Sequence, residues 1–155
     1  MSRHLKKIQP PPPPSGTHTW LVLWKAYTAV REYASRDISS RGLTLTDFGI
    51  LEALLHKGPL PVNDLGRLVS LTSGSITTAV DRLQTRGVVE RRSHAADARA
   101  RVVHLTRSGR KQIEAVYRKH SAAMDGLGDV LAPEEREHLV TLLKKLGMAA
   151  VAAVD

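Results

Sequence analysis

Six polar residues between positions 72 and 82 carry groups that could bind another molecule. They are Thr72, Ser73, Ser75, Thr77, Thr78 and Arg82. Serine and threonine hydroxyls both donate and accept hydrogen bonds while adding little bulk, and arginine adds a fixed positive charge with several donors. This combination suits close approach to phosphates and base edges, so the stretch predicts contact with the major groove of double-stranded DNA.

The spacing of the apolar residues predicts a helix that carries these polar side chains on its outer side. Ile76, Val80 and Leu83 recur at helical intervals and would share the inner side. Thr72 is a residue type that caps a helix start, and Gly87 is typical of the position that follows a helix end. The helix is therefore expected to run from Thr72 to just before Gly87.

A basic β-hairpin is predicted directly after this helix. Two runs rich in β-branched residues, 88–92 and 99–105, flank a polar tip. Asp97 stands two residues before Arg99, where its carboxylate could hold the guanidinium in an extended position. Because an arginine held in this way fits a narrow, negative minor groove, Asp97 and Arg99 join the candidate DNA-binding residues.

Short motifs also occur in a particular order between about residues 43 and 110. They are Leu43-Thr44, Asp47, Leu51, Asp64-Leu65, Leu71-Thr72, Asp81-Arg82-Leu83, Arg86-Gly87-Val88-Val89-Glu90-Arg91, Asp97, Arg99, Leu105-Thr106 and Gly109. As an ordered set they resemble the MarR family of bacterial transcription regulators. The chain departs from the family's usual pattern by having Asp47 for Gln, Pro61 for Ser and Ala98 for Arg, and by Gly74 in the recognition helix.

The resemblance implies a fold that is mainly α with a small β wing. Composition sets apart a basic, proline-rich arm at 1–16 that is expected to be disordered, and the resemblance makes 17–155 a single MarR-like domain. Within the domain, a winged helix-turn-helix occupies 43–110, and dimerisation helices occupy 17–41 and 112–153. The resemblance further implies a homodimer in which the helix from Thr72 enters the major groove and Arg99 enters the minor groove.

Two more helices are predicted before the recognition helix. Thr44 would cap the first, with Asp47 at its third position reaching back to the capping residue, and Gly58-Pro59 would end it. The short first helix of the helix-turn-helix would then run from Pro61 to about Val69.

The final predicted helix carries a long apolar stripe. Thr106 is expected to cap a long helix, and a break at 126–133 separates it from the last one. The stripe comprises Leu139, Leu142, Leu143, Leu146, Ala149, Ala150 and Ala153. A monomer of 155 residues could not easily bury it, so we expect it to pack against a second subunit. The alternative is packing within one chain.

The net charge of +8 is concentrated on the candidate reading segment. Residues 61–111 carry 10 basic and 4 acidic side chains, whereas 112–155 carry 5 and 7. Nucleic-acid binding would explain this distribution, and a merely solvated basic surface is the alternative.

The sequence offers no catalytic or metal site. It has no cysteine, which excludes disulfides, thiolate nucleophiles and cysteine-based zinc sites. His120 lies on an apolar stripe and is interpreted as a core histidine with a hydrogen-bond partner rather than as a metal ligand. Glu134, Glu135 and Glu137 are interpreted as first-turn acids that the helix dipole favours. We therefore predict a protein that is not an enzyme and has no cofactor.

Four aromatic residues, Trp20, Trp24, Tyr27 and Phe48, form the candidate ligand pocket. In the family resembled, a cleft between the dimer helices and the DNA-reading lobe can take a small, often aromatic or phenolic, anionic ligand. A small aromatic or phenolic effector is therefore an expected partner. The alternative is that these residues are simply core beneath the first helix, since helical spacing alone produces such a stripe.

Taken together, these features predict a homodimeric repressor that reads a pseudo-palindromic operator and is relieved by a small ligand. The alternative is a winged-helix architectural or protein-interaction module without sequence-specific reading. No apolar run approaches the ~20 residues that span a bilayer, so we expect a cytoplasmic protein with no membrane partner. The five prolines Pro10 to Pro14 predict a stiff arm that contacts DNA, binds another domain or is simply solvated.

Overall fold

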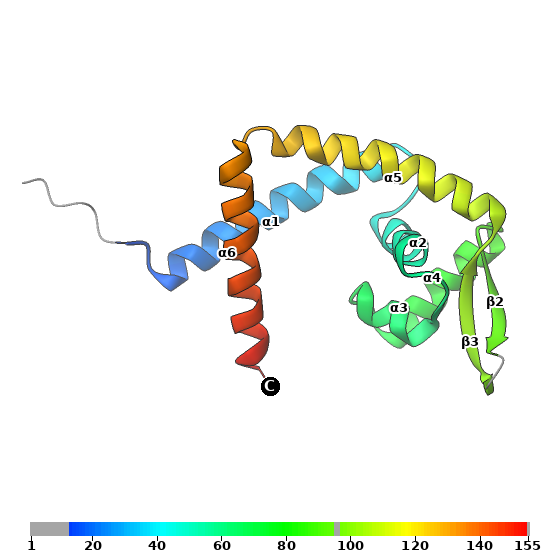
Figure 1. Ribbon diagram of the computed structural model, residues 1–155. Coiled ribbons are helices and arrows are strands. Elements are labelled where there is room, and N and C mark those ends of the chain that lie inside the picture. Colours follow the sequence, from blue (N-terminus) through cyan, green and yellow to red (C-terminus); the bar gives the residue numbers. More distant parts are fainter. Residues whose placement is uncertain (1–12, 95–96, 155) are drawn as a thin grey trace, which may run out of the picture. The chain divides into compact units, whose positions relative to one another are not determined.

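The computed structural model describes the backbone of residues 13–94 and 97–154, with the side chains of 13–92 and 101–154. The elements follow one another as α1 (Gly16–Ser39), α2 (Leu45–Lys57), β1 (Leu60–Pro61), α3 (Val62–Leu68), α4 (Ser73–Thr85), β2 (Val89–His94), β3 (Asp97–Leu105), α5 (Arg107–Gly128) and α6 (Pro133–Ala152) (Figure 1). The chain divides into two compact units, and the boundary along the sequence falls between Tyr33 and Ala34. The fold is mainly helical with a small β wing, which confirms the predicted class.

Three of the helices begin at threonine caps. The Thr44 hydroxyl accepts a hydrogen bond from the Asp47 amide at 3.0 Å, and the Thr72 hydroxyl accepts one from the Ser75 amide at 3.3 Å. The Thr106 hydroxyl accepts one from the Gly109 amide, also at 3.0 Å. Each cap satisfies an amide that has no partner within its own helix, so all three predicted helix starts are confirmed.

The sheet is antiparallel with strand order β1-β3-β2. In the hairpin, Val89 lies opposite Leu105 and Arg91 lies opposite Val103, while β1 pairs Leu60 with Val103. Figure 1 shows the hairpin beside α3 and α4. The two-residue strand β1 was not predicted, because it has no alternating pattern of its own and exists only through its pairing with β3.

The hydrophobic core lies in the unit from Ala34 onward, where α2, α3, α4, α5 and the sheet meet. Its fully buried side chains include Ile50, Leu51, Leu54, Leu65, Ile76, Val80, Leu83, Val89, Val103 and Ile113. Burying each of these side chains contributes about 1.5 to 3 kcal/mol of transfer free energy. Because the predicted inner side of α4 is part of this core, the core fixes which side of α4 faces outward.

His120 of α5 is a partly buried histidine with a hydrogen-bond partner, beside the core residue Phe48. Its Nδ1 lies 2.8 Å from a carboxylate oxygen of Asp37 near the end of α1, and its ring packs edge-on against Phe48 with the ring centroids 4.9 Å apart. The Asp37 carboxylate also accepts hydrogen bonds from Arg41. The Arg41 bond, helped by the His120 bond, lowers the pKa of Asp37 against the opposing effect of burial.

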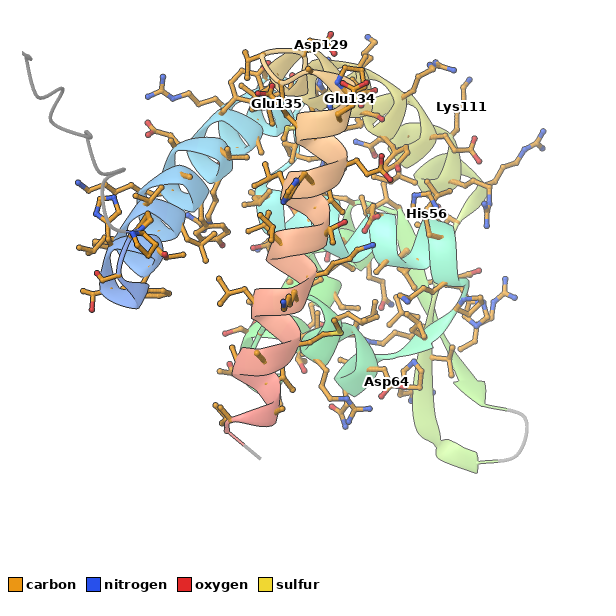
Figure 2. All side chains as sticks on the ribbon, turned by 60° about the vertical axis from the view of Figure 1, so that its left-hand side comes forward. His56, Asp64, Lys111, Asp129, Glu134 and Glu135 are labelled. Carbon is orange, nitrogen blue, oxygen red and sulfur yellow. The ribbon has the colours of Figure 1, made fainter. Side chains whose placement is uncertain are left out.

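Two of the three acids predicted for the first turn of α6, Glu134 and Glu135, stand there, and Glu137 does not. Figure 2 shows Asp129, Glu134 and Glu135 around this helix start. The Glu135 carboxylate accepts a hydrogen bond from the Ala132 amide at 2.9 Å. It therefore satisfies one of the amides that the helix start leaves without a partner.

Much apolar surface of α1 and α6 is exposed in the single chain. No residue of α6 is buried, and Ile38 is the only buried residue of α1. Trp20, Trp24 and Tyr27 are each more than half exposed, so they are not core residues within one chain. Among the described residues, none of the helices is both long and apolar enough to cross a membrane.

Candidate nucleic-acid interface

The outer side of α4 exposes the hydroxyl side chains that the sequence singled out. Thr72, Ser73, Ser75, Thr77 and Thr78 are all exposed. The Thr77 hydroxyl donates to the Ser73 carbonyl at 2.8 Å, and the Thr78 hydroxyl donates to the Gly74 carbonyl at 3.1 Å. These bonds fix the direction of both hydroxyls, while each oxygen can still accept a hydrogen bond from a partner.

One side of α4 borders an open hollow of about 680 Å³. Thr72, Ser75, Thr78 and Arg82 line it from α4, and two threonines line it from the start of α2. These two are Thr44 and Thr46. The sequence analysis did not place Thr44 and Thr46 at this surface. Hydroxyl residues at a helix start indicate a cap, whereas the surface that they share with α4 is set by tertiary packing.

A buried carboxylate joins α4 to α2 at the end of this hollow. The Asp47 side chain is 2% exposed, and it accepts hydrogen bonds from Arg82 and Arg86. Arg86 also donates to the Gly42 carbonyl at 3.3 Å. Asp47 does stand at the third position of α2 as predicted, but its carboxylate binds the two arginines instead of reaching back to Thr44. The arginines are the preferred partners because hydrogen bonds from two guanidinium groups stabilise a carboxylate more than one bond from a backbone amide does.

The opposite side of α4 is attached to the wing by Arg91 of β2. The Arg91 guanidinium lies 2.5 Å from the Asp81 carboxylate and donates to Gln84 Oε1 at 2.9 Å. It also donates to the Thr77 carbonyl at 3.4 Å. In the sequence analysis Arg91 appeared only as part of a motif. The structure shows that it fixes the first wing strand to α4.

The end of α4 is held by the first turn of α5. The hydroxyls of Thr106 and Ser108 donate to the Gly87 carbonyl at 2.8 and 3.0 Å, and the Thr106 amide donates to the Val88 carbonyl at 3.1 Å. A Cβ atom at Gly109 would lie 1.8 Å from the Val88 carbonyl oxygen. Only glycine permits this approach, so α5 begins directly on the backbone that ends α4.

The predicted wing-tip residues lie partly beyond what the structure describes. The backbone of β3 includes Asp97 and Arg99, and it pairs with β2 with an irregularity between Ser93 and His94. The side chains of Asp97 and Arg99 fall outside the described residues, so their interaction with each other stays a prediction. Nearby on the two strands, Arg92 and Arg101 are exposed.

The four candidate pocket aromatics have different surroundings. Phe48 is buried in the core against His120, whereas Trp20, Trp24 and Tyr27 lie exposed on the first part of α1. Their assignment to one ligand pocket stays a prediction.

Comparison with known proteins assigns this fold and interface to a family. A family model described as the MarR family matches residues 41–100. The HTH-type transcriptional regulator MhqR of Bacillus subtilis is 33% identical over 131 residues, which cover 84% of this chain and 90% of that protein. The HTH-type transcriptional repressor Rv2887 of Mycobacterium tuberculosis is 32% identical over 81% of this chain and 91% of its own length.

A solved structure shows the same fold. It is that of Bordetella bronchiseptica BpsR, a protein whose DNA binding is regulated by 6-hydroxynicotinic acid. It superposes with a TM-score of 0.75 at 24% identity and covers 88% of this chain and 98% of its own. Given the extent of the similarity to MhqR and the winged helix-turn-helix described above, the chain belongs to the MarR family of transcription regulators and is not an enzyme.

Proposed function

We propose that this regulator is a homodimeric repressor that reads a specific pseudo-palindromic DNA site and is released from it by a small ligand. The observation that carries the proposal is the outer side of α4, which is exposed, rich in hydroxyls and anchored on both flanks by arginine–carboxylate pairs. A helix that is fixed in this way can present side chains to base edges at a constant depth in the major groove.

The choice of reading residues follows from the geometry of α4. Thr72, Ser75 and Thr78 line the hollow, and Ser73 and Thr77 lie on the side where Arg91 attaches the wing. Short hydroxyl side chains allow the helix backbone to come close to the bases. Arg99 and Asp97 at the wing would add a minor-groove contact beside this helix.

The homodimer is supported by the exposed apolar surface of α6. Leu139, Leu142, Leu143 and Leu146 are between 42% and 52% exposed in the single chain. Soluble monomers seldom leave such a continuous apolar row in water. A second copy of α6 would cover it, and a two-fold axis would place two copies of α4 on successive half-sites about one helical turn apart.

Repression and release by a ligand are supported by the relatives. Rv2887 is named a repressor, and a small aromatic acid, 6-hydroxynicotinic acid, regulates the DNA binding of BpsR. In this chain Trp20, Trp24 and Tyr27 are exposed aromatic side chains that could pack against such an aromatic acid.

Selection of bound sequences from a random duplex pool tests the reading function. We expect a palindromic consensus with two half-sites, and a much higher affinity for that duplex than for a scrambled one. Salt titrations of both duplexes separate the phosphate contribution from base reading. If no consensus emerges while all duplexes bind with similar affinity, the protein is an architectural binder instead. If no duplex binds, the wing and α4 serve a protein partner.

A further inference from the structure

We propose that Asp47 is a positioning residue that holds Arg82 away from the DNA phosphates while it fixes α4 against α2. Affinity would then depend on the hydroxyl side chains of α4 more than on charge. This inference rests on the proposed DNA-reading function. It gives Arg82, which the sequence analysis placed among the DNA contacts, a structural role in the wild-type protein.

The burial of Asp47 is the first observation. Asp47 is 1% exposed, and it is the only charged residue among the buried side chains of the described part of the chain. Its two oxygens are divided between Arg82 and Arg86. A buried carboxylate is costly unless it is paired and hydrogen-bonded, so these two arginines must remain with it. Salt screens a pair with one buried partner less than it screens an exposed pair.

The position of Arg82 is the second observation. Its side chain is 47% exposed and lines the same hollow as Thr72, Ser75 and Thr78. Without Asp47, its long side chain would be free to turn toward a phosphate beside α4. Among the described residues, the Arg82 side chain donates a hydrogen bond only to Asp47, whereas Arg86 also donates one to the Gly42 carbonyl. Loss of Asp47 would therefore release Arg82 more fully than Arg86.

The other flank of α4 shows the same arrangement. Arg91, the cation on the wing side, is neutralised by Asp81 and is only 20% exposed. The cations on both sides of the reading surface are thus paired with carboxylates of the protein. Between them, residues 73–80 present hydroxyls and no charged side chain. This stretch itself gains little from phosphates, so it adds little to the binding of arbitrary DNA.

The test uses Asp47→Asn in the full-length protein, with the selected duplex and its scrambled counterpart. The amide keeps the size of the side chain but removes the charge that retains Arg82. One additional phosphate contact steepens the dependence of log affinity on log salt by about 0.9, so a dimer that gains one contact in each protomer steepens it by about 1.8, which corresponds to about 60-fold between 1 M and 0.1 M salt. We expect the affinity for scrambled DNA to rise by roughly that factor in low salt. The affinity for the selected duplex should rise less, because an α4 that is held less firmly makes weaker base contacts.

Two further variants complete the cycle. Adding Arg82→Gln to Asp47→Asn should return the scrambled-DNA affinity and the salt slope to their wild-type values, since the released cation is gone. Glu52→Gln removes one negative charge from the same helix without freeing Arg82, and it should leave both quantities unchanged. If Glu52→Gln raised the affinity for scrambled DNA equally, the net charge alone would explain the increase and the inference would be wrong.

A purely structural role gives a different result. In that case Asp47→Asn would weaken binding to both duplexes in parallel, with an unchanged salt slope and a lower melting temperature. If Asp47→Asn does not fold, Arg82→Gln alone decides the question, because Asp47 keeps Arg86 as a partner. We expect this variant to retain the wild-type salt slope. A slope shallower by about 0.9 for each protomer would show that Arg82 already contacts a phosphate and would overturn the inference.

These outcomes are separate from the proposed function itself. If wild-type protein selects no consensus and binds no duplex, the proposed function fails before any variant is made. If the wild type prefers the selected duplex to the scrambled one, but Asp47→Asn weakens binding to both duplexes with an unchanged salt slope, the DNA-reading function stands and only this inference fails.

Discussion

At the scale of single residues, the structure uses aspartates to hold arginines at the junctions between elements. Asp37 binds Arg41 and reaches His120 on α5, Asp47 binds Arg82, and Asp81 binds Arg91. The Asp37–His120 and Asp47–Arg82 pairs join residues 83 and 35 positions apart. These carboxylates therefore contribute to tertiary structure as well as to local charge.

The pH dependence of stability should reveal the Asp37 junction. The pKa of Asp37 is lowered from 3.8 in the folded protein, so its contribution is complete above that value and is lost as the pH falls through the folded pKa. Asp37→Asn should reduce the free energy of unfolding by about 1 to 3 kcal/mol at neutral pH. The difference from wild type should shrink in acid. Urea unfolding at one protein concentration measures it, and a difference that grows as the pH falls would contradict the assignment.

The matched control for this measurement is Asp125→Asn. Asp125 is an exposed residue of α5, and its replacement should change stability by less than about 0.5 kcal/mol at any pH.

The wing arginine can be tested at the same scale. Arg99→Ala should weaken binding to the selected duplex by about 1 to 3 kcal/mol and make the salt dependence shallower, while the protein stays folded. Arg107→Ala, at the exposed start of α5, removes the same charge outside the wing. Gel-shift titrations compare the two variants. Wild-type affinity for Arg99→Ala would exclude its minor-groove role.

At the scale of elements, α5 approaches the backbone that follows α4 closely at Gly109. Gly109→Ala places a methyl group into the Val88 carbonyl, so either α5 or the start of β2 must move. We expect a loss of roughly 1 to 3 kcal/mol or more in unfolding free energy. Gly126→Ala in the same helix meets no atom within 4 Å and should stabilise the protein by about 0.5 to 1 kcal/mol. Equal effects of the two changes in thermal unfolding would argue against the close contact.

The elements that the sequence predicted well are those defined by local chemistry. Thr44, Thr72 and Thr106 cap helices because a hydroxyl needs only an amide three residues away. The features that were missed depend on distant partners. Asp47 was expected to complete a local cap, but its partners Arg82 and Arg86 lie 35 and 39 residues further along the chain. Likewise, β1 needs β3 to exist, and the shared hollow needs α2 and α4 to be packed together.

At the scale of the whole molecule, subunit association can be tested on α6. Leu142 and Leu146 are 52% and 44% exposed in the single chain, so a monomer would tolerate a charge at either position. In the proposed dimer, Leu142→Glu or Leu146→Glu buries an unpaired carboxylate and should cost several kcal/mol of association free energy, about 2 to 5. Sedimentation should show a dimeric wild type and monomeric or aggregated variants.

Val130→Glu serves as the control for this experiment, because Val130 is 81% exposed in the connection between α5 and α6. This variant should remain a dimer. A monomeric wild type would refute the proposed interface directly.

Ligand control also concerns the whole molecule. Both tryptophans of the chain, Trp20 and Trp24, lie on α1, so indole fluorescence reports on this segment alone. An aromatic carboxylate that acts as the effector should quench this fluorescence and weaken DNA binding by roughly 5- to 150-fold, and DNA should weaken ligand binding by the same factor. Quenching without an effect on DNA affinity would show that the aromatic residues bind ligands without regulating the protein.

The attachment of α5 to the end of α4 has a mechanical consequence. A helix of 22 residues is about 33 Å long, and α5 begins on the backbone of Gly87 and Val88. These bonds couple α4 to the start of α5, so we expect the two helices to move together. By simple geometry, a tilt of about 5° over that length displaces one end by about 3 Å relative to the other, close to the 3.4 Å spacing of stacked base pairs. A partner that holds the Gly128 end of α5 would thereby set the position of α4 along the DNA to within one base pair.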